Sequence, residues 1–67
     1  MKIDKDKVEE LLEERAFSKR ELAARANVGY NTLLRITSGQ IEDVLPRTLR
    51  RIADALEVEP KTLRGDR

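Results

Sequence analysis

The chain contains no cysteine and no histidine, and this double absence constrains its fold more than any other feature. A chain of 67 residues buries only about 60% of the surface that it exposes when unfolded, so its core is small. Disulfides and thiolate zinc sites need cysteine, and histidine is the commonest metal ligand. The sequence therefore predicts one small soluble domain over residues 1–67, with no metal and no cofactor.

The absence of histidine and cysteine also argues against an enzymatic function. Histidine is the commonest acid–base group and cysteine a common nucleophile. The acidic pairs Glu9-Glu10 and Glu13-Glu14 lie along one predicted helix as a solvated stripe, and no partner group completes a catalytic dyad. No apolar run is long enough to cross a bilayer, and no charged-then-apolar leader opens the chain. We expect a cytoplasmic, non-enzymatic domain without a membrane segment or a small-molecule ligand.

The charges are unevenly distributed, although the net charge is only +1. Residues 1–17 carry 4 basic and 6 acidic residues, residues 18–52 carry 7 and 3, and residues 53–67 carry 3 and 4. The basic middle favours a polyanionic partner on that segment. The alternative is that a chain with 40% charged residues simply has a solvated helical surface.

Apolar residues recur at helical spacing throughout, and the composition is rich in Leu, Ala, Glu and Arg. Asp4 is a candidate N-cap, and Ser18 with Glu21 forms a candidate capping box. Helices are predicted over residues 5–16, 19–26, 29–38 and 46–57, followed by a last turn from residue 60 and a frayed tail over 64–67. The predicted core residues are Val8, Leu11, Leu12, Leu22, Ala23, Ala26, Leu33, Ile36, Leu49, Ile52, Ala53 and Leu56. The fold class is all-α, a compact bundle of four to five helices.

The second and third helices form a helix-turn-helix layout, because both are short and about three residues join them. The small residues Ala23 and Ala26 allow the third helix to cross the second closely. The outward face of the third helix is mixed polar, aromatic and basic. Such a face packs poorly in a core but suits a DNA major groove, which admits one α-helix. Its residues are Tyr30, Asn31, Leu34 and Arg35.

At this point the sequence resembles the phage repressor and Cro type of helix-turn-helix, also called the xenobiotic-response-element type. The resemblance covers about residues 8–64 and is carried by SKRELAARANVGYNTLLRITSG followed by PRTLRRIADALEVEPKTL. It implies a lambda-repressor-like bundle, with the helix-turn-helix proper over residues 18–38. It also implies binding to operator DNA as a homodimer on a two-fold symmetric site.

The resemblance also implies roles for single residues. Base reading falls to Tyr30, Asn31, Leu34 and Arg35, and DNA backbone contacts fall to Lys19, Arg20, Thr32 and Arg47. Cations at the start of a helix oppose its dipole, and a bound phosphate would offset the cost at Lys19 and Arg20.

Each assignment has a plainer alternative. Arg35 can read guanine through its fork, or contact a phosphate or form a salt bridge. Asn31 can pair with adenine or serve as a polar residue of the first turn. Tyr30 can contact the sugar–phosphate backbone or be half-buried against the second helix. Leu34 can meet a thymine methyl or, more in keeping with its type, pack at a dimer interface or against the fourth helix. The arginines at 47, 50 and 51 can form an ordinary solvated face, and Arg47 alone is assigned to DNA.

The sequence departs from the family pattern at several positions. Asn27 replaces the usual turn glycine but tolerates the same left-handed conformation. Gly29 replaces a Ser or Thr cap, so the third helix should start less firmly. Thr37 stands where Glu is common, and the acidic loop over residues 40–45 should point away from DNA or limit affinity.

The predicted function is a transcription regulator that binds double-stranded DNA sequence-specifically. We expect this regulator to be a repressor. One alternative is a helical protein-interaction module such as an antitoxin, for which exposed apolar residues at 34, 44 and 45 would be the marker. Another is the DNA-binding segment of a larger repressor or recombination accessory factor. The operator and the regulated genes do not follow from the sequence.

Overall fold

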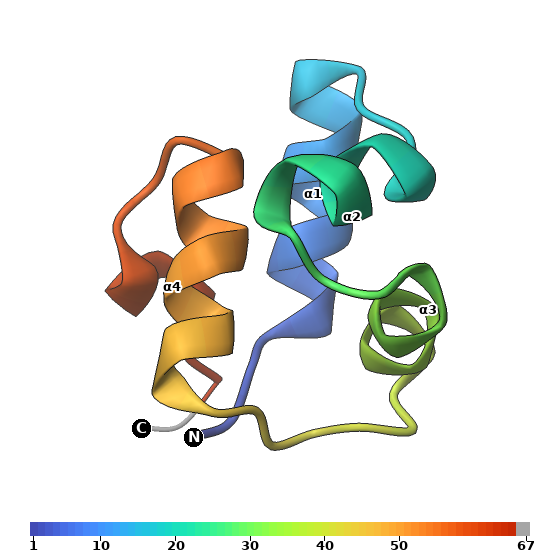
Figure 1. The fold of residues 1–67 in the computed structure, drawn as a ribbon. Coiled ribbons are helices and arrows are strands. Elements are labelled where there is room, and N and C mark those ends of the chain that lie inside the picture. The colour runs from blue at the N-terminus through green and yellow to red at the C-terminus, as the bar shows by residue number, and fades with distance from the viewer. Residues whose placement is uncertain (66–67) are drawn as a thin grey trace.

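This computed structural model describes residues 1–65, which fold into four α-helices and one short 3-10 helix. The fold is all-α, as the sequence predicts. Figure 1 shows α4 on one side of the molecule, α3 on the other, and α1 and α2 between them. None of these helices is long and apolar enough to span a membrane within the described residues. The elements are α1 (Lys5–Arg15), α2 (Lys19–Ala26), α3 (Tyr30–Ser38), α4 (Pro46–Ala55) and η1 (Pro60–Leu63).

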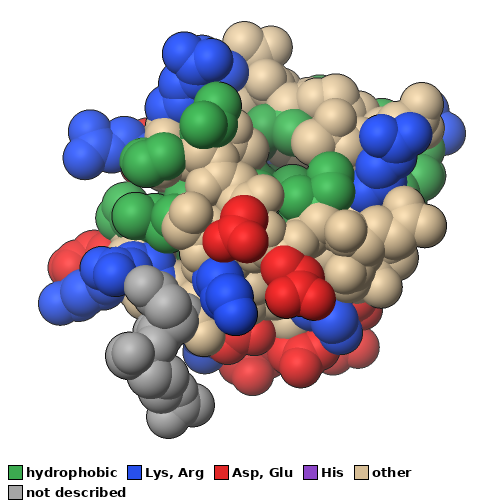
Figure 2. Space-filling view, turned by 90° about the horizontal axis from the view of Figure 1, so that it is seen from below, with side chains coloured by type: hydrophobic (Ala, Val, Ile, Leu, Met, Phe, Trp, Pro, Cys, Tyr) green, Lys and Arg blue, Asp and Glu red, His purple; other side chains and the backbone are tan. Residues whose placement is uncertain are grey.

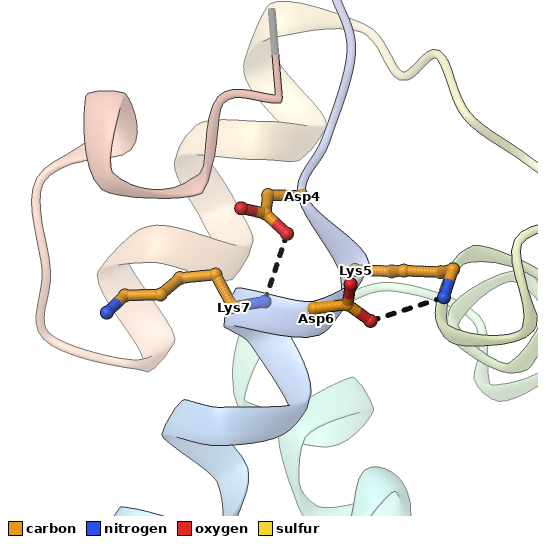
Figure 3. A network of polar contacts seen from close by, with 4 residues as sticks. All are labelled: Asp4, Lys5, Asp6 and Lys7. Carbon is orange, nitrogen blue, oxygen red and sulfur yellow. Dashed lines mark hydrogen bonds and ion pairs between the residues drawn. The ribbon is translucent and has the colours of Figure 1, made fainter.

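The first two helices begin at the predicted caps. The Asp4 carboxylate accepts a hydrogen bond from the backbone N–H of Lys7 at 3.1 Å, as Figure 3 shows. The Ser18 hydroxyl accepts one from the N–H of Glu21 at 3.0 Å. The other half of the capping box does not form, because the Glu21 carboxylate pairs instead with Arg25 at 3.1 Å. Each cap satisfies a backbone donor that the helix itself leaves free.

An exposed ion pair follows the first cap. Lys7 Nζ donates a hydrogen bond to the Glu10 carboxylate at 3.1 Å. This hydrogen bond, together with the attraction of the Glu10 charge, raises the pKa of Lys7 above its ordinary value. The pair lies on the solvated side of α1, opposite its buried residues. It therefore contributes to the polar face of α1 rather than to a site.

Two helices end earlier than predicted, and both endings have the same cause. Helix α1 stops at Arg15 rather than residue 16, and α4 stops at Ala55 rather than residue 57. Ala16 and Glu57 adopt left-handed backbone conformations, with φ of 57° and 61°. The next N–H then bonds back across the final turn, from Phe17 to Leu12 and from Val58 to Ala53, each at 3.0 Å. The apolar residue after each turn packs on the core, which offsets the strain of a non-glycine residue there.

The core contains every predicted core residue. Leu22, Leu33, Ile36 and Ile52 have no exposed surface, so α2, α3 and α4 meet at one apolar centre. Ile3 is an addition that the helical pattern did not predict, since it precedes α1. The complete buried apolar set is Ile3, Val8, Leu11, Leu12, Leu22, Ala23, Ala26, Leu33, Ile36, Leu49, Ile52, Ala53, Leu56 and Leu63.

The N-terminal segment joins the acidic loop to the C-terminal segment. Ile3 N–H bonds the Glu42 carbonyl at 3.0 Å, and Val44 N–H bonds the Met1 carbonyl at 2.8 Å. Gly65 N–H bonds the Lys2 carbonyl at 3.0 Å on the other side. The prediction of a frayed tail is therefore wrong for residues 64–65, and residues 66–67 lie outside the described residues. The loop over residues 40–45 is held in place by its backbone hydrogen bonds to the N-terminal segment.

Arg15 holds the end of α4 against α1, because its Nε donates to the carbonyl of Leu56. Hydrogen bonds from charged donors contribute about 1.5–3 kcal/mol, and partial exposure reduces that value. We expect Arg15→Met to lower the free energy of unfolding by about 1–2 kcal/mol, measured by urea titration followed by circular dichroism. The matched control is Glu14→Gln, since Glu14 is exposed on the same helix. Equal stability of the two variants would contradict this role for Arg15.

Candidate nucleic-acid interface

The turn between α2 and α3 has the geometry that the helix-turn-helix layout requires. Asn27 adopts the left-handed conformation, with φ 57° and ψ 45°, as its chemistry predicts. The N–H of Val28 bonds the Ala23 carbonyl at 3.0 Å, and Val28 packs on the core. Ala23 and Ala26 are buried, and Ala26 lies beside Arg51 and Ala55 of α4. The turn thus fixes the direction of α3 without a glycine.

Helix α3 has a buried side and an open side. Leu33, Ile36 and Thr37 are buried, whereas Asn31, Thr32 and Arg35 are exposed. Tyr30 and Leu34 are half-buried between these sides, and Tyr30 packs against the core, which agrees with its packing alternative. No acidic residue occurs in α3, so its open side presents only neutral and positive groups.

Thr37 belongs to the core rather than to the open side. Its hydroxyl donates to the carbonyls of Leu33 and Leu34, at 3.1 and 3.2 Å. This buried hydroxyl is therefore satisfied within its own helix. A longer acidic side chain at this position would have to leave the core, so the departure from the family pattern is a packing feature.

The starts of α2 and α3 meet through one ring contact. The Arg20 guanidinium lies over the Tyr30 ring, 4.3 Å from its centre. Both residues are predicted site residues, but their stacking was not predicted, because it depends on the angle between the two helices. A cation over an aromatic face is attracted by the ring quadrupole. The contact holds Tyr30 at the start of a helix whose N-cap, Gly29, supplies no side-chain hydrogen bond.

Several of the predicted site residues, among them Lys19, Asn31 and Arg35, have side chains without a hydrogen-bond or ion-pair partner among the described residues. Lys19 lies half-buried at the first position of α2, and Arg35 is exposed on α3. Neither forms an ion pair within residues 1–65. Asn31 is exposed in the first turn of α3. The side chains of these residues retain free N–H groups that can donate hydrogen bonds to an external ligand.

Arg47 lies apart from the others. It occupies the first turn of α4, and Figure 1 shows that the start of α4 lies across the molecule from α3. It lines a groove between α4 and η1 together with Arg50. Its predicted DNA contact remains a prediction. Sequence reasoning gave Arg50 no role, although its spacing of three residues from Arg47 places both on one helical face.

The acidic loop is neutralised only in part by the N-terminal segment. Asp43 lies 3.6 Å from the N-terminal amine, and both groups are partly exposed. Figure 2, which views the molecule from below, shows acidic side chains near the middle and along one edge of this face, with basic side chains both beside them and toward its rim. This face is therefore of mixed charge, unlike the open side of α3.

Comparisons with solved structures find the same fold inside larger proteins. The chain is similar to a mutant of hydroxyethylphosphonate dioxygenase, with 27% identity and a TM-score of 0.84. It is also similar to PhpD with cadmium complexed with hydroethylphosphonate, with 29% identity and a TM-score of 0.81. In both cases 98% of this chain aligns with 14% of the other chain. The chain thus spans about one-seventh of those proteins. No curated protein matches it.

The comparison with protein families agrees with the geometry of α2 and α3. The sequence profile of one family, described as a Cro/C1-type HTH DNA-binding domain, matches residues 7–65. The match includes all four α-helices except the first two residues of α1. It therefore covers the bundle as well as the helix-turn-helix. The chain belongs to the Cro/C1-type helix-turn-helix DNA-binding domain family.

Proposed function

We propose that the protein is a transcription regulator that binds a specific double-stranded DNA site by placing α3 in the major groove. The observation that carries this proposal is the open side of α3, which lacks acidic residues and presents Arg35 without an ion-pair partner among residues 1–65. A face of this kind on a helix-turn-helix can donate to base edges while its scaffold contacts the phosphates. Such a regulator acts where the DNA is, in the cytoplasm of a bacterium or a phage-infected cell.

The proposed base-reading residues divide by chemistry. Arg35 reads guanine through two parallel N–H donors, and Asn31 pairs with adenine by donating and accepting. Leu34, half-buried beside them, offers a methyl surface that fits a thymine methyl at the edge of the groove. Tyr30 is turned partly toward α2 by Arg20, so its hydroxyl serves the sugar–phosphate backbone or a neighbouring base.

The proposed backbone contacts lie at the starts of both helices. Lys19 and Thr32 keep polar groups exposed or half-exposed near the first turns of α2 and α3. Arg20 keeps its N–H donors in the plane of a guanidinium that stacks on Tyr30. A stacked guanidinium can still bind a phosphate through its edge. Arg20 therefore combines a structural contact with a phosphate contact.

We also propose that residues 1–67 act as one domain and bind as a homodimer on a two-fold symmetric operator. A single module of this size buries little surface on DNA, so useful affinity needs two copies. In a dimer the two recognition helices lie about 34 Å apart, one turn of the duplex. Repression then follows when the bound dimer occludes polymerase.

Replacing Lys19 with alanine tests the backbone assignment. We expect Lys19→Ala to weaken binding to all duplex sequences by a similar factor, because phosphates carry no sequence information. The slope of log affinity against log salt should fall by about one. Fluorescence anisotropy at several salt concentrations measures both quantities. An unchanged slope would remove Lys19 from the backbone contacts.

The proposed function is tested by selecting binding sites from random duplex DNA and then measuring affinity against salt. An enriched site with two-fold symmetry supports a specific dimeric regulator and gives the half-site spacing. Binding without enrichment, weak and steeply dependent on salt, contradicts sequence-specific recognition by this chain. Arg51 is exposed on α4, and Figure 1 shows α4 on the other side of the molecule from α3, so Arg51→Ala provides a control for Lys19→Ala with the same loss of charge.

A second candidate is that the chain represents the helix-turn-helix segment of a larger protein. The observation that favours it is the alignment of nearly the whole chain with 14% of two larger proteins. In that case the segment contributes DNA binding or a purely structural role to its parent. The mass of the natural product, measured from its own cells, separates this candidate from a free regulator.

A further inference from the structure

We propose that a groove between α4 and η1 binds an acidic amphipathic segment of a partner protein. Figure 1 shows η1 on the opposite side of α4 from α3, and this α4–η1 groove is lined by residues of α4 and η1. The proposal therefore adds a protein-binding surface that is separate from α3 and does not depend on DNA binding, and it assigns Arg47 to this surface in place of its predicted DNA contact. The residues that line the groove are Met1, Pro46, Arg47, Leu49, Arg50, Pro60, Lys61 and Arg64.

The shape of the groove suits an apolar side chain. Its volume is about 430 Å³, within the range of about 300–1,000 Å³ that is common for ligand pockets. Its lining includes the almost completely buried Leu49, two prolines and the partly exposed Met1. Leu45, the residue before α4, is 57% exposed. Met1 and Leu45 are the large hydrophobic residues that remain exposed in the described part of the chain; Met1 lines this groove, and Leu45 directly precedes Pro46, which also lines it.

The charge around the groove is unbalanced. Arg47 and Arg50 are exposed, lie three residues apart on α4, and form no ion pair within residues 1–65. Like charges at this spacing repel, and cations near a helix start oppose its dipole. The first turn of α4 contains no acidic residue that would offset this cost. A carboxylate-bearing ligand would offset it.

Lys61 also favours a ligand that carries carboxylates. It pairs with Glu59 at 3.7 Å, but both side chains are largely exposed. An exposed pair of this kind contributes little and exchanges readily with an incoming carboxylate. The rim thus offers up to three cations around an apolar floor, which matches a segment that alternates acidic and apolar side chains.

Other occupants fit the groove less well. A second copy using the same groove would bring Arg47 and Arg50 against their own counterparts, which is repulsive. The acidic face of α1 in a second copy offers charge, but its apolar residues Val8, Leu11 and Leu12 are buried. Duplex DNA offers phosphates but no side chain to fill the apolar floor. An acidic segment of a protein supplies both features.

The test begins with a displayed library of random 12-residue peptides, selected against the folded protein. We expect enriched peptides to carry Leu, Ile, Met or Phe flanked by several Asp and Glu residues. A synthetic, fluorescein-labelled copy of the most enriched peptide is then measured by anisotropy. Replacing its acidic residues with amides, or its apolar residues with serine, should each weaken binding about tenfold. Failure to enrich such peptides would overturn the proposal.

The site is located by a pair of charge reversals on the same helix. Arg50→Glu should weaken peptide binding about tenfold, because it places a carboxylate at the rim. Arg51→Glu is the matched control, since Arg51 lines a different surface together with Arg25 and Asn27, and it should change binding less than twofold. Both residues are exposed, so the fold is retained, and circular dichroism verifies it. Equal effects of the two variants would refute the assignment.

Two further measurements exclude the other occupants. Sedimentation of the unmodified protein reports self-association, and a dimer that Arg50→Glu dissociates would identify a second copy as the occupant and overturn the proposal. Binding of a 20-base-pair duplex reports the other possibility. If Arg50→Glu weakens duplex binding as much as peptide binding, the groove contacts DNA and the proposal is wrong. A loss confined to the peptide supports it.

Discussion

Leu33→Ala should leave the domain largely unfolded or barely stable at room temperature. Leu33 has no exposed surface, and it is the residue through which α3 enters the common core with Ile36. Removing a buried leucine side chain to alanine costs about 2–5 kcal/mol, part of it from the cavity left behind. A domain of this size has a total stability of only about 3–10 kcal/mol. One truncation therefore removes much of the stability.

The measurement is urea denaturation of Leu33→Ala followed by circular dichroism, beside Leu45→Ala as the control. Leu45 is 57% exposed, so its truncation should change the free energy of unfolding by less than about 0.5 kcal/mol. DNA binding by Leu33→Ala should fall with the folded fraction and recover when conditions restore folding. A loss below about 1 kcal/mol at Leu33 would mean that α3 is attached to the bundle by other contacts.

The starts of α1 and α2 could be predicted because each depends on one local side chain. Asp4 and Ser18 bond backbone groups only three residues away, so the sequence contains the whole interaction. The glycine at 29 likewise predicts a start without a side-chain cap, and α3 has none. Interactions within one turn can be read directly from the order of residues.

The ends of α1 and α4 were harder to predict than the starts of helices, because non-glycine residues take the left-handed position there. Ala16 and Glu57 carry no sequence signal for that conformation. The useful signal is the apolar residue that follows each one, Phe17 and Val58, which packs on the core. That signal becomes interpretable only when the position of the core is known. Asn27, whose side chain favours the conformation, was the exception.

Contacts between distant segments were not predictable from periodicity. The bonds from Ile3 to Glu42 and from Gly65 to Lys2 join segments without helical patterning. The stacking of Arg20 on Tyr30 depends on how α2 and α3 cross. The position of Arg47, beside Arg50 and η1 rather than beside α3, depends on the path of the loop over 40–45. The predicted site is therefore one surface on α2 and α3 together with one separate arginine.

Arg35→Ala should give the largest change in DNA recognition. Arg35 is exposed on α3 and has no acidic partner within residues 1–65, so its removal leaves no buried group unsatisfied and should not affect folding. On the selected site we expect a loss of about 1–3 kcal/mol, with relaxed preference at one base pair. Competition binding on a set of duplexes, each changed at one position, measures both effects.

Arg35→Lys separates base reading from phosphate binding. Lysine keeps the positive charge but loses the planar fork that matches guanine. If Arg35 reads a base, Arg35→Lys should lose most of the preference at that position while keeping part of the affinity. If Arg35 contacts a phosphate, Arg35→Lys should behave almost like the unmodified protein, and Arg35→Ala should weaken every sequence equally. The second pattern would assign Arg35 to the DNA backbone with Lys19, and base reading would then rest on Asn31 and its neighbours in the first turn of α3.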